Sequence, residues 1–406
     1  MALAESFGIR VAFDGRERPE KLQVRVSMRY QFVFDRVFGE GEEFVVVIED
    51  DLTAAVDFVD YFHGLAGAMR RDESIFCVSA WNDNAYPATS ANSSVVRRGE
   101  HFMALGWMTS KRIYENNVKP HWENVGGRDW DWPFAQGMKS DHKFECLFPE
   151  VSRVHHERDQ EGQAYSTSHG LQKDRFETMS LATIPKVPLN PDAVESTAYE
   201  TSIHDFIADA IPITAFEDIF TYHHRNLVFR CEDCSSERRP VDGWKKLLEK
   251  RLGVYSFGID GRVRGEHRGS VFIRHATNLV LIVGRDSEYY PGLPMPTTPV
   301  VPPGSDAKSW IAKSTRTIVG AAGQSCVEVC DATPGFVCDA QAMGFLNGCA
   351  VLAARVPECA AECKVVESKF APLRDLEDGC AITWPRFINC ESKEEGTSRI
   401  CVCVKE

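Results

Sequence analysis

The sequence predicts a mixed α/β protein that carries a small, disulfide-rich module at its C-terminal end. Two observations lead to this prediction. The run at residues 44–48 is apolar and rich in β-branched residues, and helix-like patterns stand on both sides of it, which is the alternation typical of α/β sheets. Ten of the 14 cysteines fall between Cys326 and Cys403, a density typical of disulfide scaffolds.

Periodicity places the main elements along the chain. Residues 44–48 are predicted to form a strand buried on both faces, as in a parallel sheet covered by helices. Apolar residues at helical spacing predict helices at 21–38, 57–69 and 243–251, and strand-like runs lie at 75–79, 144–148, 270–274 and 278–283.

Three acids, Glu49, Asp50 and Asp51, directly follow the strand predicted at 44–48. Two carboxylates roughly 4 Å apart repel by about 4 kcal/mol at an intermediate dielectric, so three in succession need open water or a cation. Ligands of open α/β sheets collect at the carboxyl ends of strands, and a divalent ion held there would keep coordination sites free for phosphate oxygens. Two interpretations stay open from this stretch alone: a metal-dependent phosphate site, or a strand that leads into a solvated acidic loop.

A second candidate group lies around residue 130. Asp129 and Asp131 would point the same way from an extended loop, and Trp130 and Trp132 the other way. An acid among indole rings loses water and its pKa rises, which suits a general base, and indole faces also stack on sugars. The alternative is a surface turn whose tryptophans anchor a flap.

Other candidate ligands carry weaker signals. His155 and His156 are adjacent and would face opposite ways in a strand, so we expect loop histidines rather than a metal pair. Cys231 and Cys234 have metal-ligand spacing without a second pair nearby, which favours a short-loop disulfide. Gly-Lys-Ser/Thr and Gly-x-Ser-x-Gly sequences are absent, which excludes P-loop and serine-hydrolase interpretations.

The charge of the chain excludes some classes of binding partner, and its cysteines indicate the cellular compartment. A net charge of −13 and a pI near 5.5 argue against a nucleic acid or an anionic membrane surface as the main partner. No run approaches about 18 apolar residues and the N-terminus does not resemble a signal peptide, so no membrane segment is expected in this chain.

The C-terminal cysteines are expected to pair, because no histidine follows His275 and the tail lacks Cys-x-x-Cys, which makes zinc the weaker interpretation. Disulfides indicate an oxidising, secretory-route compartment, and an N-terminal truncation would explain the missing targeting segment.

Five motifs, in order, resemble one known family. They are 46–52 (Val-Val-Ile-Glu-Asp-Asp-Leu), 77–84 (Cys-Val-Ser-Ala-Trp-Asn-Asp-Asn), 105–107 (Leu-Gly-Trp), 130–131 (Trp-Asp) and 149–153 (Pro-Glu-Val-Ser-Arg). Together they are similar to glycosyltransferase family 13, the family of N-acetylglucosaminyltransferase I and protein O-mannose β-1,2-N-acetylglucosaminyltransferase. The resemblance runs from about residue 21 to about residue 290 and weakens after Gly170. It implies a GT-A-like nucleotide-sugar transferase domain.

The resemblance also implies roles for individual residues. The metal-binding aspartate of the family falls on Asp51, and the catalytic base falls on Asp131. The family's disulfide falls on Cys77 and Cys146. The implied nucleotide-sugar contacts are Glu49, Asp50, Leu105, Trp130 and Ser168, the last of which would face the diphosphate.

The sequence departs from the family at three places. The first strands of the family, which grip the uracil, have no counterpart, because the chain begins just before the helix predicted at 21–38. Arg29 replaces a family histidine near the uridine, and Pro133-Phe134-Ala135 replaces a Trp-Met-Arg sequence after the catalytic loop.

The expected organisation has four parts. They are a GT-A-like catalytic domain at 1–190 without its first strands, a small, β-rich α/β extension at 191–292, a proline-rich linker at 293–318 and a cysteine-rich disulfide module at 319–406. The module is similar to the cysteine-rich tail of N-acetylglucosaminyltransferase V, which implies an accessory role.

The expected function is the inverting transfer of N-acetylglucosamine from UDP-GlcNAc to the 2-hydroxyl of a terminal α-mannose on a glycan or glycoprotein. The resemblance implies manganese (Mn²⁺) as the cofactor and the Golgi lumen as the location, with a membrane anchor upstream of this sequence. The alternative is a catalytically inactive carbohydrate-binding protein on the same scaffold.

Overall fold

A computed structural model describes residues 12, 14–16, 19–124, 128–156, 179–185, 187–235, 242–256, 262–294, 306–360, 363–375 and 379–405. The chain forms two compact units. The smaller unit consists of Met1–Val47 with Met108–Phe144, and the larger consists of Ile48–Trp107 with Glu145–Glu406.

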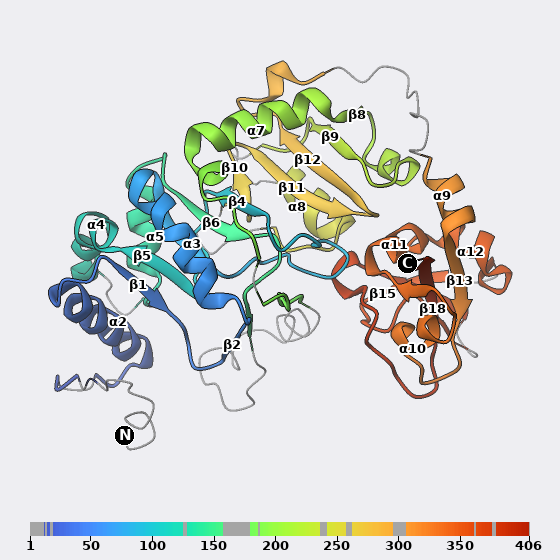
Figure 1. Ribbon diagram of the computed structural model, residues 1–406, viewed down its shortest axis with the longest axis horizontal. Helices are drawn as coiled ribbons and strands as arrows, with labels where there is room; N and C mark the ends of the chain where they lie inside the picture. The colour runs from blue at the N-terminus through green and yellow to red at the C-terminus, as the bar shows by residue number, and fades with distance from the viewer. Residues whose placement is uncertain are drawn as a thin grey trace. The chain divides into compact units, whose positions relative to one another are not determined.

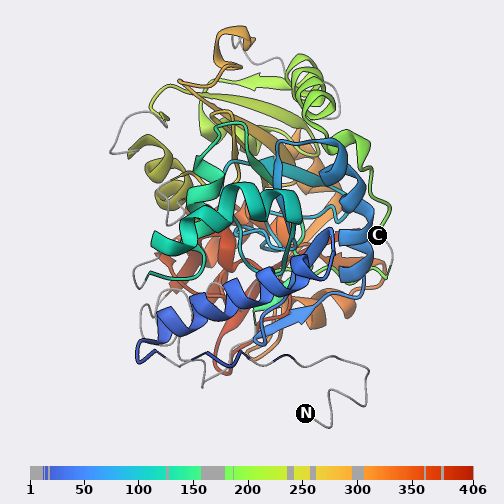
Figure 2. The same ribbon diagram turned by 90° about the vertical axis from the view of Figure 1, so that its left-hand side faces the viewer.

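The smaller unit contains the long helix α2 (Leu22–Gly39), seen along its length in blue in Figure 2. The helix predicted at 21–38 is confirmed, because Phe34 and Phe38 recur on one face of α2 and are fully buried. None of the helices in the described part of the chain has the length and apolarity that crossing a bilayer requires. The other elements of this unit are β1 (Phe44–Val47), β5 (Trp107–Ser110, which begins at the unit boundary), α4 (Lys111–Ile113), η1 (Tyr114–Val118), η2 (Lys119–Asn124) and α5 (Trp132–Lys139).

Strand β1 is less buried than predicted. It is an edge strand that pairs with β5, and Val46 next to its end is 41% exposed. Ile48, which was predicted to extend the strand, lies beyond it and is 48% exposed. The expectation of burial on both faces was wrong, because an edge strand has a neighbour on one side only and its faces are less fully covered.

In the first part of the larger unit, two strands pair with β6, one on each side. Strand β3 runs parallel to β6, β4 runs antiparallel to β6, and a separate antiparallel ribbon is formed by β2 and β7. Cys77 on β3 lies opposite Cys146 on β6, and the two form a disulfide. The bounds are β2 (Leu52–Ala54), α3 (Phe58–Arg71), β3 (Ile75–Ser79), β4 (Val96–Gly99), β6 (Glu145–Pro149) and β7 (Val154–His156).

The next part of the larger unit is a five-stranded sheet with helices on both faces. The strand order is β10-β11-β12-β9-β8, and helix α7 lies along one face (green in Figure 1). Alternation along β12 explains the layers: Leu281 and Val283 pack against α7, and Val280 and Ile282 pack on the face of Trp244 in α8. The bounds are η3 (Asp192–Val194), α7 (Ser196–Asp209), β8 (Ile211–Ile213), η4 (Phe216–Thr221), β9 (Asn226–Cys231), α8 (Asp242–Lys245), η5 (Lys246–Arg251), β10 (Glu266–His267), β11 (Ser270–His275), β12 (Asn278–Gly284) and η6 (Tyr290–Gly292).

The cysteine-rich tail (orange to red in Figure 1) is organised around β18, which pairs with β13, β14 and β16. Its disulfides are Cys326–Cys401, Cys330–Cys403, Cys338–Cys390, Cys349–Cys363 and Cys359–Cys380. Cys231 and Cys234 form the expected short-loop disulfide, so all fourteen cysteines are paired. The bounds are α9 (Ala307–Ser314), β13 (Thr315–Val319), α10 (Cys326–Asp331), β14 (Phe336–Cys338), α11 (Ala340–Leu346), α12 (Cys349–Arg355), η7 (Pro357–Ala360), β15 (Cys363–Val366), β16 (Leu373–Asp375), β17 (Gly379–Thr383), η8 (Pro385–Phe387) and β18 (Ser398–Lys405).

The proline-rich stretch leads directly into packed structure. Residues 295–305 of the expected linker lie outside the described residues, and residues 307–319 form α9 and β13. The reason is apolar contact: Ile311 on α9 and Phe345 on α11 share a buried cluster with Ala276, which follows β11. Trp310 stacks on the His223 ring with 5.1 Å between ring centroids. The tail therefore packs on the preceding sheet.

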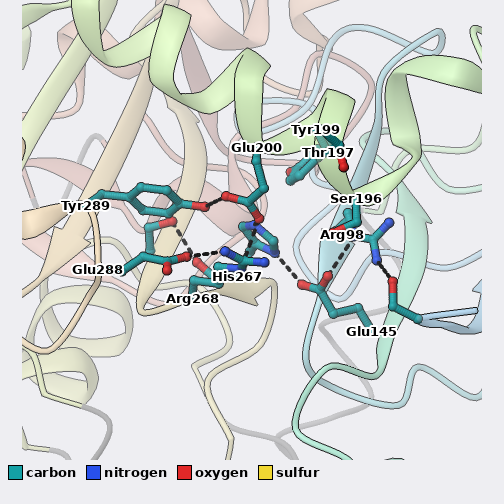
Figure 3. Close-up of polar contacts among 12 residues, drawn as sticks. Arg98, Glu145, Ser196, Thr197, Tyr199, Glu200, His267, Arg268, Glu288 and Tyr289 are labelled. Carbon is teal, nitrogen blue, oxygen red and sulfur yellow. Dashed lines mark hydrogen bonds and ion pairs between the residues drawn. The ribbon is translucent and has the colours of Figure 1, made fainter. Parts of the chain in front are cut away.

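A buried ionic network joins strands β4 and β6 to the five-stranded sheet that contains β10 (Figure 3). Glu145 on β6 accepts a hydrogen bond from Arg98 Nε on β4 at 2.6 Å and also contacts His267 Nδ1 on β10. The other ring nitrogen of His267 lies 2.9 Å from Glu200 on α7. Burial alone would lower the pKa of His267, but the two carboxylates outweigh burial and raise its pKa to about 8.

We expect this network to make stability depend on pH. Because the folded-state pKa of His267 lies above its unfolded value of about 6.5, its contribution is fully present below that value. It is lost as pH rises through about 8. The free energy of unfolding, measured with urea, should fall by about 2 kcal/mol between about pH 6 and about pH 9.5. His267→Gln should remove most of this fall, whereas His63→Gln, at an exposed position on α3, should not. Equal pH dependence in all three proteins would contradict the prediction.

Candidate metal and substrate site

The three acids lie on a turn between β1 and β2. The N–H of Leu52 donates to the carbonyl of Glu49 at 3.3 Å and closes the turn. Asp50 is exposed, while Glu49 and Asp51 are half-buried. The three carboxylates are therefore in different environments, and Asp51 is the one that leads into the β2–β7 ribbon.

Asp51 combines a bound oxygen with an unsatisfied one. Its Oδ2 lies 3.3 Å from His156 Nε2, and its Oδ1 is shielded from solvent and has no hydrogen-bond partner. The hydrogen bond from His156 lowers the pKa of Asp51 against the opposing effect of burial, so the side chain is ionised. A shielded carboxylate oxygen with no partner is costly unless a cation meets it, so Asp51 fits a hard divalent ion.

The histidine that contacts Asp51 was not predicted as a site residue. His155 and His156 lie on β7, so the expectation of loop histidines was wrong. In the register of the ribbon His156 is opposite Leu52, next to Asp51. The two segments are about a hundred residues apart in sequence, and periodicity within either of them carries no signal of this pairing. No three His, Cys, Asp or Glu side chains in the described ranges converge as a metal group.

Two of the recognised motifs support each other. The Asn82 side chain donates to the carbonyl of Glu150 at 2.9 Å, and the backbone N–H of Asn82 donates to Ser152 Oγ at 3.0 Å. Arg153 is fully buried and lies 3.1 Å from Asp57 at the start of α3. These motifs therefore hold the segment after β3 to the segment between β6 and β7, and the latter to the start of α3.

Leu105 lies beside a close backbone approach. Gly106 has φ +56°, and a Cβ there would lie 2.7 Å from Val154 of β7. Its carbonyl accepts a hydrogen bond from the N–H of Ala80 at 2.6 Å. Only glycine combines this conformation with this contact. The glycine of the Leu-Gly-Trp motif is therefore required for packing against β7, whatever the role of Leu105.

The loop that carries Asp131 is held by helix α2 within the smaller unit. Trp130 stacks on Tyr30 with ring centroids 4.0 Å apart and parallel planes, and Ser27 Oγ donates to the carbonyl of Arg128 at 3.1 Å. Asp131 is the N-cap of α5 and has helical backbone angles, φ −75° and ψ −16°. The alternation expected of an extended loop therefore does not apply to Asp129 and Asp131.

The predicted site residues are distributed over both units. Glu49, Asp50, Asp51 and Leu105 belong to the larger unit, and Trp130 and Asp131 belong to the smaller one. Ser168 lies outside the described residues.

The sheets and the paired cysteines define the class: a disulfide-bonded α/β protein. The GNT-I family matches residues 10–226, more than half of the chain, and the protein belongs to this family. The chain is also similar to the alpha-1,3-mannosyl-glycoprotein 2-beta-N-acetylglucosaminyltransferase of Arabidopsis thaliana, with 26% identity over 291 residues. That alignment covers 67% of this chain and 59% of the plant protein, so the chain spans less than two thirds of the length of this relative.

Proposed function

We propose that the protein transfers N-acetylglucosamine from UDP-GlcNAc to the 2-hydroxyl of a terminal α-mannose, with inversion and with Mn²⁺ as cofactor. Membership of the GNT-I family and the similarity to a plant enzyme named for this transfer support the reaction. The observation that carries the proposal is the unpartnered Oδ1 of Asp51, because a cation at that oxygen is what a metal-dependent nucleotide-sugar site requires.

The acidic turn would bind the donor. Asp51 would hold the metal through Oδ1, and Glu49 and Asp50 would contact the nucleotide-sugar from the same turn. Bound Mn²⁺ would neutralise the charge that develops on the UDP leaving group. Leu105, Trp130 and Ser168 would complete the contacts to the sugar and the diphosphate.

Asp131 would act as the general base. Its carboxylate would take the proton from the mannose 2-hydroxyl as that oxygen attacks the anomeric carbon, and the bond to the UDP oxygen would break in the same displacement. The position of Asp131 supports this role, because the Tyr30–Trp130 stack and the start of α5 hold its backbone on both sides.

The remaining assignments follow from the same family. We place the protein in the Golgi lumen, where the disulfides would persist. A GT-A-like fold is proposed for the transferase part. We assign the cysteine-rich tail an accessory role, because none of the proposed catalytic or binding residues lies in it.

The direct test is a transfer assay with the purified chain. UDP-GlcNAc, MnCl₂ and a terminal α-mannoside are incubated with the protein, and the linkage of the product is determined by NMR. A β-1,2-linked product that disappears with EDTA is expected. UDP-GlcNAc binding without any transfer would favour the inactive carbohydrate-binding alternative.

Asp51→Asn should weaken Mn²⁺ binding on the order of a hundredfold in the presence of UDP, because the substitution removes the negative charge at the ligand oxygen. Electron paramagnetic resonance titration of free Mn²⁺ gives the affinity directly. Asp60→Asn is the matched control, because it removes the same charge at an exposed position on α3. Unchanged Mn²⁺ affinity in Asp51→Asn would refute the metal assignment.

A further inference from the structure

The contact between Asp51 and His156 depends on the register of the β2–β7 ribbon. The pairs are Leu52 with His156, Thr53 with His155, and Ala54 with Val154. Asp51 stands immediately before β2, and His156 is the last residue of β7. A shift of the register by one residue would turn His156 to the other face of the ribbon.

The residues that precede His156 are buried and held by side-chain and backbone contacts. Arg153, just before the strand, is fully buried, pairs with Asp57, and its carbonyl accepts a hydrogen bond from the N–H of Ala55 at 2.8 Å. Val154 is also buried and packs where Gly106 leaves room for it. The His156 side chain is only 11% exposed, so its imidazole has little freedom to move away from Asp51.

The two carboxylate oxygens of Asp51 therefore have separate roles. Oδ2 is engaged by His156 Nε2 at 3.3 Å, and Oδ1 is shielded and unpartnered. A free aspartate on a turn can rotate and present either oxygen, or both, to a cation. A carboxylate that is hydrogen-bonded through one oxygen presents the other in a fixed direction, which is how outer partners orient metal ligands.

We propose that His156 is a positioning residue of the metal site, which holds Asp51 through Oδ2 so that Oδ1 alone is presented to the divalent cation. The inference rests on the proposed function, because it takes Asp51 as the metal ligand. It adds a residue from β7 that acts on the metal only through Asp51.

The inference is tested by Mn²⁺ affinity in the presence of UDP, measured on the full chain by electron paramagnetic resonance titration. His156→Ala should weaken Mn²⁺ about tenfold, the scale typical of lost outer partners. His156→Gln should restore affinity to within about threefold of the wild type, because its amide N–H₂ reaches the place of Nε2. His155→Ala is the control, since its side chain leaves the opposite face of β7, and it should bind like the wild type.

A spectroscopic measurement separates positioning from direct ligation. Electron spin echo modulation of the bound Mn²⁺ should show no coupling to a directly coordinated imidazole nitrogen. Such a coupling, wild-type affinity in His156→Ala, or equally weak binding in His156→Gln and His156→Ala would each overturn the inference. If instead the wild type and Asp51→Asn bind Mn²⁺ equally, the metal assignment of the proposed function fails and the inference fails with it. Thermal unfolding of each variant verifies that the ribbon is intact.

Discussion

Asp131→Asn is expected to lower kcat by about 10²–10⁴-fold and to leave the dissociation constant for UDP-GlcNAc nearly unchanged. A general base acts mainly in the transition state, so its loss appears in turnover rather than in donor affinity. Asparagine keeps the size of aspartate, and the side chain at this position makes no capping hydrogen bond, so α5 (Trp132–Lys139) should begin at the same residue. The measurements are single-turnover transfer to an α-mannoside and calorimetric binding of the donor.

Asp129→Asn supplies the control for this prediction. Asp129 is exposed two residues before Asp131 and carries the same charge, so the substitution tests whether the effect belongs to one carboxylate. It should keep turnover within about threefold of the wild type, because an exposed acid that contacts no reacting atom contributes little. Full turnover in Asp131→Asn together with a large loss in Asp129→Asn would place the base two residues earlier.

Removal of the Cys326–Cys401 disulfide is expected to destabilise the cysteine-rich tail by about 2 kcal/mol. This bridge spans 75 residues, but the Cys330–Cys403 bridge spans 73 residues of the same stretch and remains in place, so the loop that the first bridge alone closes is short. In the double variant Cys326→Ala/Cys401→Ala, amide hydrogen exchange in β18 should accelerate by about 30-fold.

The matched control for the tail is Cys231→Ala/Cys234→Ala. This disulfide spans a sequence separation of 3, so the same loop-closure relation gives less than about 2 kcal/mol. It belongs to the preceding sheet, so amide exchange in β18 should stay at the wild-type rate. If β18 exchanges equally in both double variants and in the wild type, the first disulfide does not hold the tail together.

Local patterns predicted the elements in which burial follows the pattern of apolar residues. The strand predicted at 75–79 is β3, in which every residue is buried, and the helix predicted at 57–69 corresponds to α3 (Phe58–Arg71). In these segments the spacing of apolar residues matches the side chains that are buried, so the sequence pattern is sufficient to predict the element. The run at 44–48 has an equally apolar sequence, but sheet position, which is a property of the whole fold, leaves its end exposed.

The candidate site also has features that the sequence could predict and features that it could not. The acids at 49–51 could be recognised from sequence, because three adjacent carboxylates after an apolar run are locally unusual. The His156 contact could not be predicted, because it depends on the pairing of β2 with β7. The orientation of Asp131 was also missed, since the residue takes helical angles as the N-cap of α5 where an extended loop was expected. Single-sequence periodicity does not report non-local pairing or helix caps of this kind.

The central position of β18 in the tail sets the order in which the tail can fold. This strand pairs with β13, β14 and β16, and it carries Cys401 and Cys403, the partners of Cys326 and Cys330. Synthesis reaches residues 398–405 only after every other strand of that sheet has been made. Strands β13 and β14 and the cysteines Cys326 and Cys330 must therefore wait without these neighbours, exposed to mispairing during translation. The two native disulfides to β18 form late, and their yield should depend on a thiol-disulfide isomerase acting after these residues emerge.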